Sequence, residues 1–335
     1  MYKIRLLLLC ILCYSLMNAQ NNIHFTQYYN APMTLNPALT GQFNDAFRAT
    51  AIMRQQWSGL STLSSSEYLM KTASGSFETS LLKRRLGIGL CILNDETGSS
   101  IFNSYRGYFS LSYAQRIGDN YLSFGVQPMF NLSSLDRTKL DFGKIDESNF
   151  NDNVSYFDLN AGINYHHDFG FFLADFGASA THLLQPKEQF SKVPTKERIP
   201  MFYKAYATFK DWEIVNKLEL HPGIFVGFQA NTTNIVYGSN ISYKLFEVKG
   251  QASKIYLGLW GRSNRTNVES IIGLFGIGFG KTTFMASYDY NTTFATREQY
   301  VTGRTNTFEF SIVHTFTPKV KPPLLEDNFI FNPRF

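Results

Sequence analysis

The chain has 335 residues and a formal net charge of +5, and its mean hydropathy of −0.17 is too polar for a bundle of membrane-spanning helices. Aromatic residues make up 16% of the chain, with 31 Phe and 19 Tyr, and charged residues only 17%. The small positive charge does not gather on a basic face, which argues against a nucleic-acid-binding protein. Lipid-facing aromatic residues alternating with polar lumen residues would explain both the aromatic content and the polar mean hydropathy.

Residues 1–19 are predicted to be a secretory signal peptide. A positively charged start precedes an apolar run, and Ala19 offers a small residue for cleavage. No later apolar run reaches the roughly 20 residues that a membrane-spanning helix requires. Cleavage near Ala19 would remove Cys10 and Cys13, so Cys91 would remain alone and no internal disulfide is expected.

Residues 20–46 form an N-terminal segment that is not strand-like. The segment is polar, rich in Asn, and interrupted by Pro32 and Pro37. Turns are expected at Asn30 and at Asn36-Pro37. The pattern fits an ordered N-terminal arm, and it fits equally well a plug or a periplasmic latch.

From residue 47 onward, apolar and polar residues alternate with the period of two that is typical of strands. The alternation is clearest in 154–166, where Phe157 and its parity oppose Asp158 and its parity. Neither a helix nor a fully buried sheet would show this pattern. The expected strands are 47–57, 67–76, 86–94, 105–116, 121–132, 154–166, 171–183, 202–210, 218–230, 234–246, 254–262, 270–280, 283–294 and 307–316.

These fourteen runs predict an all-β fold: a transmembrane outer-membrane β-barrel of about 14 antiparallel strands over residues 47–316. Weak patterns in two of the runs leave twelve or sixteen strands open, and an array of soluble β-sandwiches is the alternative fold. Short turns follow even-numbered strands and long polar loops follow odd-numbered ones, which is the barrel rule and puts both termini in the periplasm.

The C-terminal tail, residues 317–335, cannot continue the sheet because Pro318, Pro322 and Pro323 interrupt it. Its end, Phe-Ile-Phe-Asn-Pro-Arg-Phe, is too hydrophobic for a simple solvated tail. We therefore expect this periplasmic tail to dock against a partner or against the barrel rim.

The sequence shows no motif for catalysis, for a cofactor or for a metal. The adjacent His166 and His167 would face opposite sides of a strand, so they cannot chelate one ion together. The parity expected to face the lumen carries charged residues of both signs, and such residues usually pair with each other. They are Arg48, Arg54, Asp158, Asp175, Asp289 and Glu309.

Four motifs, in order, carry a resemblance to a known family. They are Phe25-Thr26-Gln27-Tyr28, then Asn36-Pro37-Ala38 with Gly41, then Arg54-Gln55-Gln56-Trp57, and finally Asn332-Pro333-Arg334-Phe335. In layout and motifs the chain resembles the PorP/SprF family of Bacteroidota outer-membrane proteins. Thr26 and Asn332 are mild departures from the family pattern.

The resemblance implies a non-enzymatic role beside the type IX secretion system, in the outer membrane of a Gram-negative bacterium. The implied partners are outer-membrane lipid, the C-terminal domain of a large secreted protein such as a gliding adhesin, and periplasmic components of the secretion system. The implied role is to assist secretion or surface anchoring of that protein. The alternative is a 14-stranded transporter for hydrophobic or small solutes, since such a barrel has room for a plugged lumen. A lipid hydrolase is disfavoured.

Overall fold

The computed structural model describes residues 24–56, 70–82, 85–98, 100–118, 120–140, 147–248, 251–292 and 306–317. Within these ranges one antiparallel sheet contains fifteen strands. Their bounds are β1 Phe47–Gln56, β2 Met70–Leu81, β3 Leu86–Thr97, β4 Phe102–Ile117, β5 Asn120–Leu135, β6 Asn153–Asp168, β7 Leu173–Thr181, β8 Phe202–Lys210, β9 Trp212–Val215, β10 Leu218–Gln229, β11 Thr232–Val248, β12 Gln251–Ser263, β13 Val268–Phe279, β14 Thr282–Asn291 and β15 Thr307–Phe316.

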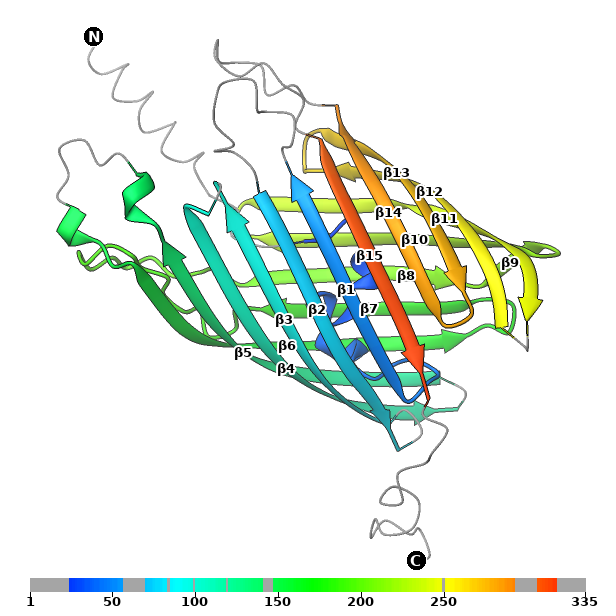
Figure 1. Cartoon of the computed structure of the whole chain (residues 1–335). Helices are drawn as coiled ribbons and strands as arrows, with labels where there is room; N and C mark the ends of the chain where they lie inside the picture. The colour runs from blue at the N-terminus through cyan, green and yellow to red at the C-terminus, as the bar shows by residue number, and fades with distance from the viewer. Residues whose placement is uncertain are drawn as a thin grey trace, which may run out of the picture.

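The sheet closes on itself, because β1 pairs with β2 on one side and with β15 on the other, and β10 pairs with β11. Figure 1 shows the first and last strands side by side in the barrel wall. The four-residue β9 continues β8: both pair with β10, and Asp211 between them has a φ of +53°. Counting β8 and β9 as one bent strand, the described chain forms a closed barrel of fourteen antiparallel strands, which confirms the predicted fold.

The strand boundaries differ from those expected mainly where the sequence pattern is weak. The second strand was expected at 67–76 and is observed as β2, Met70–Leu81. The bend at Asp211 and the short strand after it were not predicted, because the bulge breaks the alternation and the strand that follows has only four residues. Trp57 and the whole C-terminal tail after Thr317 lie outside the described residues, as does the predicted signal peptide.

Burial in the barrel is reversed relative to a soluble protein. Large apolar side chains on the outer parity are exposed, for example Ile92 at 69%, Leu259 at 68% and Leu257 at 60%, whereas inward polar residues such as Asn131 and Asp158 are at 0%. An apolar exterior is stable only where lipid replaces water, so this distribution fits a transmembrane barrel. In the part of the chain that the structure describes, no helix is long and apolar enough to span a membrane.

The interior of the barrel holds the N-terminal segment, named here the plug and comprising residues 24–46. Three short helical pieces build it: η1 Tyr28–Asn30, α2 Pro32–Leu35 and η2 Pro37–Leu39. They lie inside the ring of strands in Figure 1. Pro32 and Pro37 each begin a helical piece, where a missing N–H costs nothing.

The two ends of the barrel differ. The turn end carries short connections such as the one between β4 and β5, and β1 begins there and β15 ends there. The loop end carries the long connections 136–152 and 182–201, the first with the turns η3 Arg137–Lys139 and η4 Glu147–Asn149. The barrel rule assigns the turn end to the periplasm and the loop end to the cell exterior.

Candidate functional site: the plugged lumen

Glu309 of β15 holds the beginning of the plug. Its two carboxylate oxygens accept hydrogen bonds from the backbone N–H groups of Thr26, at 2.8 Å, and Gln27, at 2.6 Å. The Gln27 side-chain amide donates to the Glu309 carbonyl at 3.2 Å and to Ser287 at 3.1 Å. A buried backbone N–H without an acceptor costs about 1–3 kcal/mol, so the two acceptor oxygens of Glu309 fix the plug to the wall.

Charged wall residues surround this contact. Asp289 accepts from the Thr26 hydroxyl at 2.9 Å and lies 3.0 Å from the Arg262 guanidinium, which also donates to Thr26. Arg54 donates to the carbonyl of His24. Arg54 and Glu309 were both expected on the lumen parity, and in the β1–β15 register these two residues are direct partners.

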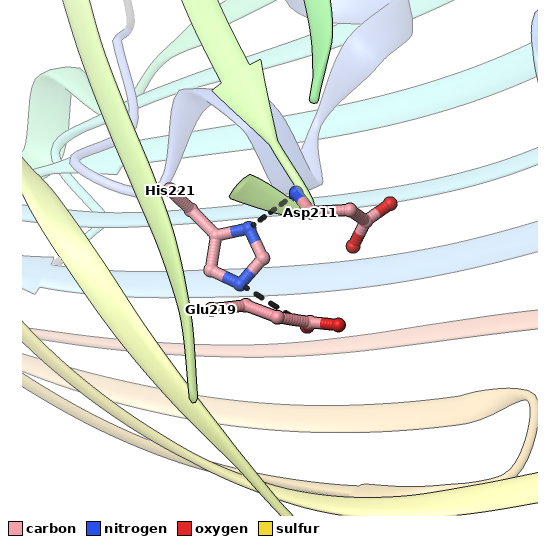
Figure 2. A group of neighbouring side chains, drawn as sticks. All are labelled: Asp211, Glu219 and His221. Carbon is pink, nitrogen blue, oxygen red and sulfur yellow. Dashed lines mark hydrogen bonds and ion pairs between the residues drawn. The ribbon is translucent and has the colours of Figure 1, made fainter. Parts of the chain in front are cut away.

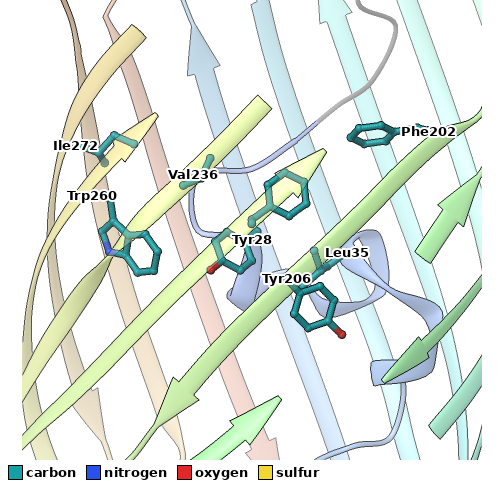
Figure 3. Close-up of a cluster of buried hydrophobic side chains, with 8 residues drawn as sticks. Tyr28, Leu35, Phe202, Tyr206, Val236, Trp260 and Ile272 are labelled. Carbon is teal, nitrogen blue, oxygen red and sulfur yellow. The ribbon is translucent and has the colours of Figure 1, made fainter. Parts of the chain in front are cut away.

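The aromatic side chains of the plug pack against one side of the lumen. Tyr28 has ring neighbours in Phe225, with centroids 5.4 Å apart, and in Trp260, edge-on at 6.0 Å. Tyr29 stacks on Trp260 at 5.6 Å. Figure 3 shows this cluster between the plug and the strands, with Leu35 beside Tyr28. Burial raises the pKa of Tyr28 above its usual value, so its phenol stays neutral.

Asn36 links the plug to β6 and β8 of the wall. Its side-chain amide donates to the carbonyl of Ile163 at 2.9 Å and to the Tyr206 hydroxyl at 3.1 Å, and its oxygen accepts the Ala38 N–H at 2.9 Å. A Cβ on Gly162 would lie 2.0 Å from the Asn36 oxygen, so the wall must be small there. The Asn36-Pro37-Ala38 motif therefore caps η2 and anchors it to β6.

The end of the plug rests on glycines of β3. Gly41 has a φ of +72°, which favours glycine, and its N–H donates to Glu78 at 2.9 Å. A Cβ on Gly87 would lie 2.0 Å from the carbonyl of Thr40. Glu78 in turn pairs with Arg48 at 2.8 Å. Gly87 thus serves close packing between this strand and the plug.

The remaining motif residues are distributed as follows. Phe25 is buried with Ile52 and Leu93 in a second apolar cluster. Gln56 ends β1, partly buried, and its backbone pairs with Thr307. Pro333, Arg334 and Phe335 lie outside the described residues, as does Trp57. The structure brings the first two motifs and Arg54 together in the lumen, and it leaves Gln56 at the loop end.

The long loop after β7, residues 182–201, closes the loop end of the lumen and was missed as a functional element. Its Glu188 accepts hydrogen bonds from Ser133 and Asn131 on the inner wall. Ile199 is 5% exposed and packs with Met129 and Tyr156. The apolar residues within this otherwise polar loop, among them Phe190 and Ile199, were the signal in the sequence. We name this element the cap loop.

Three possible metal ligands, Asp211, Glu219 and His221, gather at the turn end (Figure 2). Two lysines already neutralise Glu219: Lys254 at 2.6 Å and Lys244 at 2.7 Å. The Nδ1 of His221 accepts the Asp211 backbone N–H at 3.2 Å. The Lys254 ammonium, 3.8 Å from Asp211, supplies the positive charge that a metal would bring. We interpret this cluster as an ion-pair network.

Between plug, wall and cap loop, little empty space is found. Two cavities border the shared residues Thr34 and Lys204, with volumes of about 20 Å³ and about 30 Å³. A pocket for an organic ligand typically has roughly 300–1,000 Å³. Neither of these two cavities has space for such a solute.

The family model described as type IX secretion system membrane protein PorP/SprF matches residues 17–313 of the chain. No curated protein matches the chain.

Solved structures of similar fold include the toluene transporter TbuX of Ralstonia pickettii, at TM-score 0.52 and 10% identity, covering 86% of this chain and 94% of that chain. The deltaS2 mutant of the TodX monoaromatic hydrocarbon channel has TM-score 0.54 and 7% identity, covering 85% and 93%. The CymD monoaromatic hydrocarbon channel has TM-score 0.53 and 10% identity, covering 86% and 93%. At these identities the likeness concerns the barrel fold alone.

Proposed function

Because the chain belongs to the PorP/SprF family of type IX secretion system membrane proteins, we propose that it is a non-enzymatic outer-membrane component that assists secretion or surface anchoring of a large exported protein. The exported protein is gliding adhesin-like, and the barrel binds its C-terminal domain. The observation that supports this role most directly is the filled lumen. A barrel closed by a plug and a cap loop acts through its surfaces.

The plug is bound to the barrel wall by hydrogen bonds at both of its ends. An intramolecular hydrogen bond contributes about 0.5–1.5 kcal/mol, and Glu309 alone accepts two from the plug backbone. Glu78 accepts a third at the other end of the plug. Opening the pore for a polypeptide would break both ends of the plug and expose its aromatic cluster. The exported chain therefore crosses elsewhere, and this barrel supports it.

The loop end is the face that we assign to the exported protein. The cap loop is fixed there by contacts with the preceding loop: Phe150 forms a β-bridge with Ser191, and Lys192 donates through its backbone N–H to Asn149 at 2.7 Å. A rigid, exposed loop loses little conformational entropy when a partner binds. At its tip Val193 is 61% exposed.

The test is site-specific photo-crosslinking in cells that express the exported protein. A photoreactive residue at Val193 should capture the C-terminal domain of the exported protein, identified by mass spectrometry after affinity purification. The matched control is Ile214 at the turn end, which is 54% exposed and should capture no part of that domain. Crosslinks from Ile214 alone, or from neither position, would contradict the proposal.

A transporter for hydrophobic or small solutes is the second candidate, favoured by the barrel fold shared with hydrocarbon channels. It requires the plug to move, since the cavities of about 20 Å³ and about 30 Å³ are too small for such a solute. Uptake of labelled toluene into proteoliposomes distinguishes the two. Uptake above that of empty liposomes would favour the transporter.

The proposed periplasmic partners would meet the turn end and the C-terminal tail. Thr317, the last described residue, lies at that end, where its hydroxyl donates to Asp45 at 2.8 Å. The tail therefore leaves the barrel on the periplasmic side if the barrel rule holds. Co-purification of secretion-system components with the full chain, lost on tail removal, would support this part of the proposal.

A further inference from the structure

The cavity of about 30 Å³ beside the plug is lined by two cationic side chains. Arg106 of β4 is 7% exposed and Lys204 of β8 is 8% exposed, and both border this cavity. Thr34 of the plug closes one side. A buried cation is costly unless an anion or several acceptors compensate it. Two cations on one small cavity therefore raise the question of what compensates them.

The partners of both cations are neutral. The Lys204 ammonium donates to the carbonyl of Thr34 at 2.6 Å and lies 5.2 Å from the centre of the Phe202 ring. The Arg106 Nε donates to the Ser104 hydroxyl at 3.3 Å. Among the described residues, no carboxylate forms an ion pair with Lys204 or with Arg106.

Three carboxylates around the cavity and Arg106 are committed to other donors. Asp95, whose charge stabilises Arg106, accepts from the Thr72 hydroxyl at 2.6 Å. Asp158 accepts from His182 at 2.6 Å and from the backbone N–H of Leu184 at 3.2 Å. Glu188 accepts from wall residues, as described above. All three carboxylates contribute negative potential at a distance, but within the described residues none forms an ion pair with Arg106 or with Lys204.

An unpartnered hydroxyl also lines the cavity. The Thr181 Oγ1 is buried without a hydrogen-bond partner among the described residues. The buried Tyr156 hydroxyl, in the cluster with the cavity-lining Met129, is likewise unpartnered. A hydroxyl can donate a hydrogen bond to an anion. The Thr181 hydroxyl is therefore a third donor at the cavity, beside the two cationic side chains.

We propose that Arg106 and Lys204 form a buried binding site for one small monovalent anion, which holds the plug in place through Lys204 and Thr34. The volume sets the chemical class. A water molecule needs roughly 10–15 Å³ of such space, so about 30 Å³ admits a halide ion or a single carboxylate group but no larger organic acid. The inference is independent of the function proposed above.

The first test uses the intact barrel, purified in detergent and crystallised with bromide in place of chloride. Diffraction at the bromine absorption edge should give an anomalous peak between Arg106 and Lys204. Absence of a peak there would overturn the proposal.

The second test asks whether the anion stabilises the fold. Thermal unfolding is measured in potassium chloride and in potassium gluconate at equal ionic strength, because gluconate is too large for the cavity. Chloride should raise the unfolding temperature of the wild type, and the difference should vanish in Arg106→Met and in Lys204→Met. Lys210→Met is the matched control on the same strand. Lys210 pairs with Asp175 at 3.0 Å, so its variant should keep the chloride effect.

Two further arms complete the design. Acetate at equal ionic strength distinguishes a carboxylate ligand from a halide: stabilisation by acetate above that by chloride assigns the site to a carboxylate. If a Met variant does not fold, Lys204→Arg retains the charge and should retain the chloride effect. A bromide peak without any chloride effect on wild-type stability means an adventitious ion only, and it would overturn the proposal, as would a chloride effect that persists in both Met variants.

Discussion

Gly125 of β5 lies directly against the plug peptide that joins Pro37 to Ala38. A Cβ added to Gly125 would come within 2.2 Å of the Ala38 nitrogen and 2.3 Å of the Pro37 carbonyl carbon. Backbone atoms on both sides cannot rotate away as a side chain can. The wall and the plug are therefore closely packed at this point. The Asn-Pro-Ala motif depends on a glycine that lies about 90 residues later in the sequence.

Gly125→Val should expel or misplace the plug. Overpacking a fitted interior costs about 1–3 kcal/mol, and more where backbone must move. We expect residues 24–46 to become sensitive to protease in outer-membrane fractions, with a lower unfolding temperature. The control is Gly107→Val, because a Cβ at Gly107 meets nothing within 4 Å. Equal protection of the plug in both variants would contradict the prediction.

Glu309→Gln should loosen the beginning of the plug. Thr26 and Gln27 donate to different oxygens of Glu309, so in the amide one of these N–H groups would face the NH₂ donor instead of an acceptor. Leaving a buried donor unsatisfied costs about 1–3 kcal/mol. Hydrogen exchange should accelerate at those two amides. Glu247→Gln, at an exposed position, is the control, and unchanged exchange in Glu309→Gln would show that the carboxylate is dispensable.

Arg54→Met should reduce the amount of assembled barrel without affecting any turnover. The change removes the donor to the His24 carbonyl and one positive charge opposite Glu309. Breaking a buried charge network by removing one member costs about 3–5 kcal/mol. Barrel abundance in outer-membrane fractions, judged by heat-modifiable migration, is the measurement. Arg116→Met, at an exposed position near the turn end, should assemble normally.

Asp45 should make the exit of the plug sensitive to acid. Burial alone would raise the pKa of the Asp45 carboxyl, but hydrogen bonds from Lys281, Thr315 and Thr317 outweigh it and lower that pKa below its usual value. A lowered pKa means that the stabilisation is complete above the ordinary Asp value of about 4 and is lost as pH falls through the lowered pKa.

The measurement is hydrogen exchange at Ala46, whose N–H donates to Thr317 at 3.2 Å. Protection should fall in the wild type as pH drops below about 4, the ordinary Asp value. In Asp45→Asn, the protection of the Ala46 amide should be lower at neutral pH and should show no such fall. Asp168→Asn, which alters an exposed turn carboxylate, should retain the step. A wild-type protein without the step would refute the role of Asp45.

Truncation after Pro318 tests the proposed docking of the tail. Burying a large apolar side chain contributes about 1.5–3 kcal/mol, so the apolar end of residues 317–335 has a strong drive to find a partner. The truncated barrel should still reach the outer membrane while surface display of the exported protein is lost. Normal display by truncated cells would mean that the tail is dispensable.

The sequence by itself determined the barrel, because the alternation of side chains is local. Period two in the run that includes Phe157 and Asp158 requires a strand with one apolar and one polar face, and fourteen such runs require closure in lipid. The lengths of the connections, which are also local, indicated which end of each strand carries a short turn and which a long loop. The bend at Asp211 escaped prediction because one inserted residue reverses the parity, and the four residues of β9 are too few to show the new alternation.

Only the tertiary structure decided what fills the barrel. Asn36 meets Tyr206 across 170 positions of sequence, and Thr26 meets Glu309 across 283. No local propensity encodes such contacts, since they exist only after the first and last strands pair and enclose the plug. The pairing also brings Arg106 and Lys204, from strands far apart in sequence, to one cavity. The strands are thus predictable from neighbouring residues. The plug, the cap loop and the anion site form only when the sheet closes into a ring.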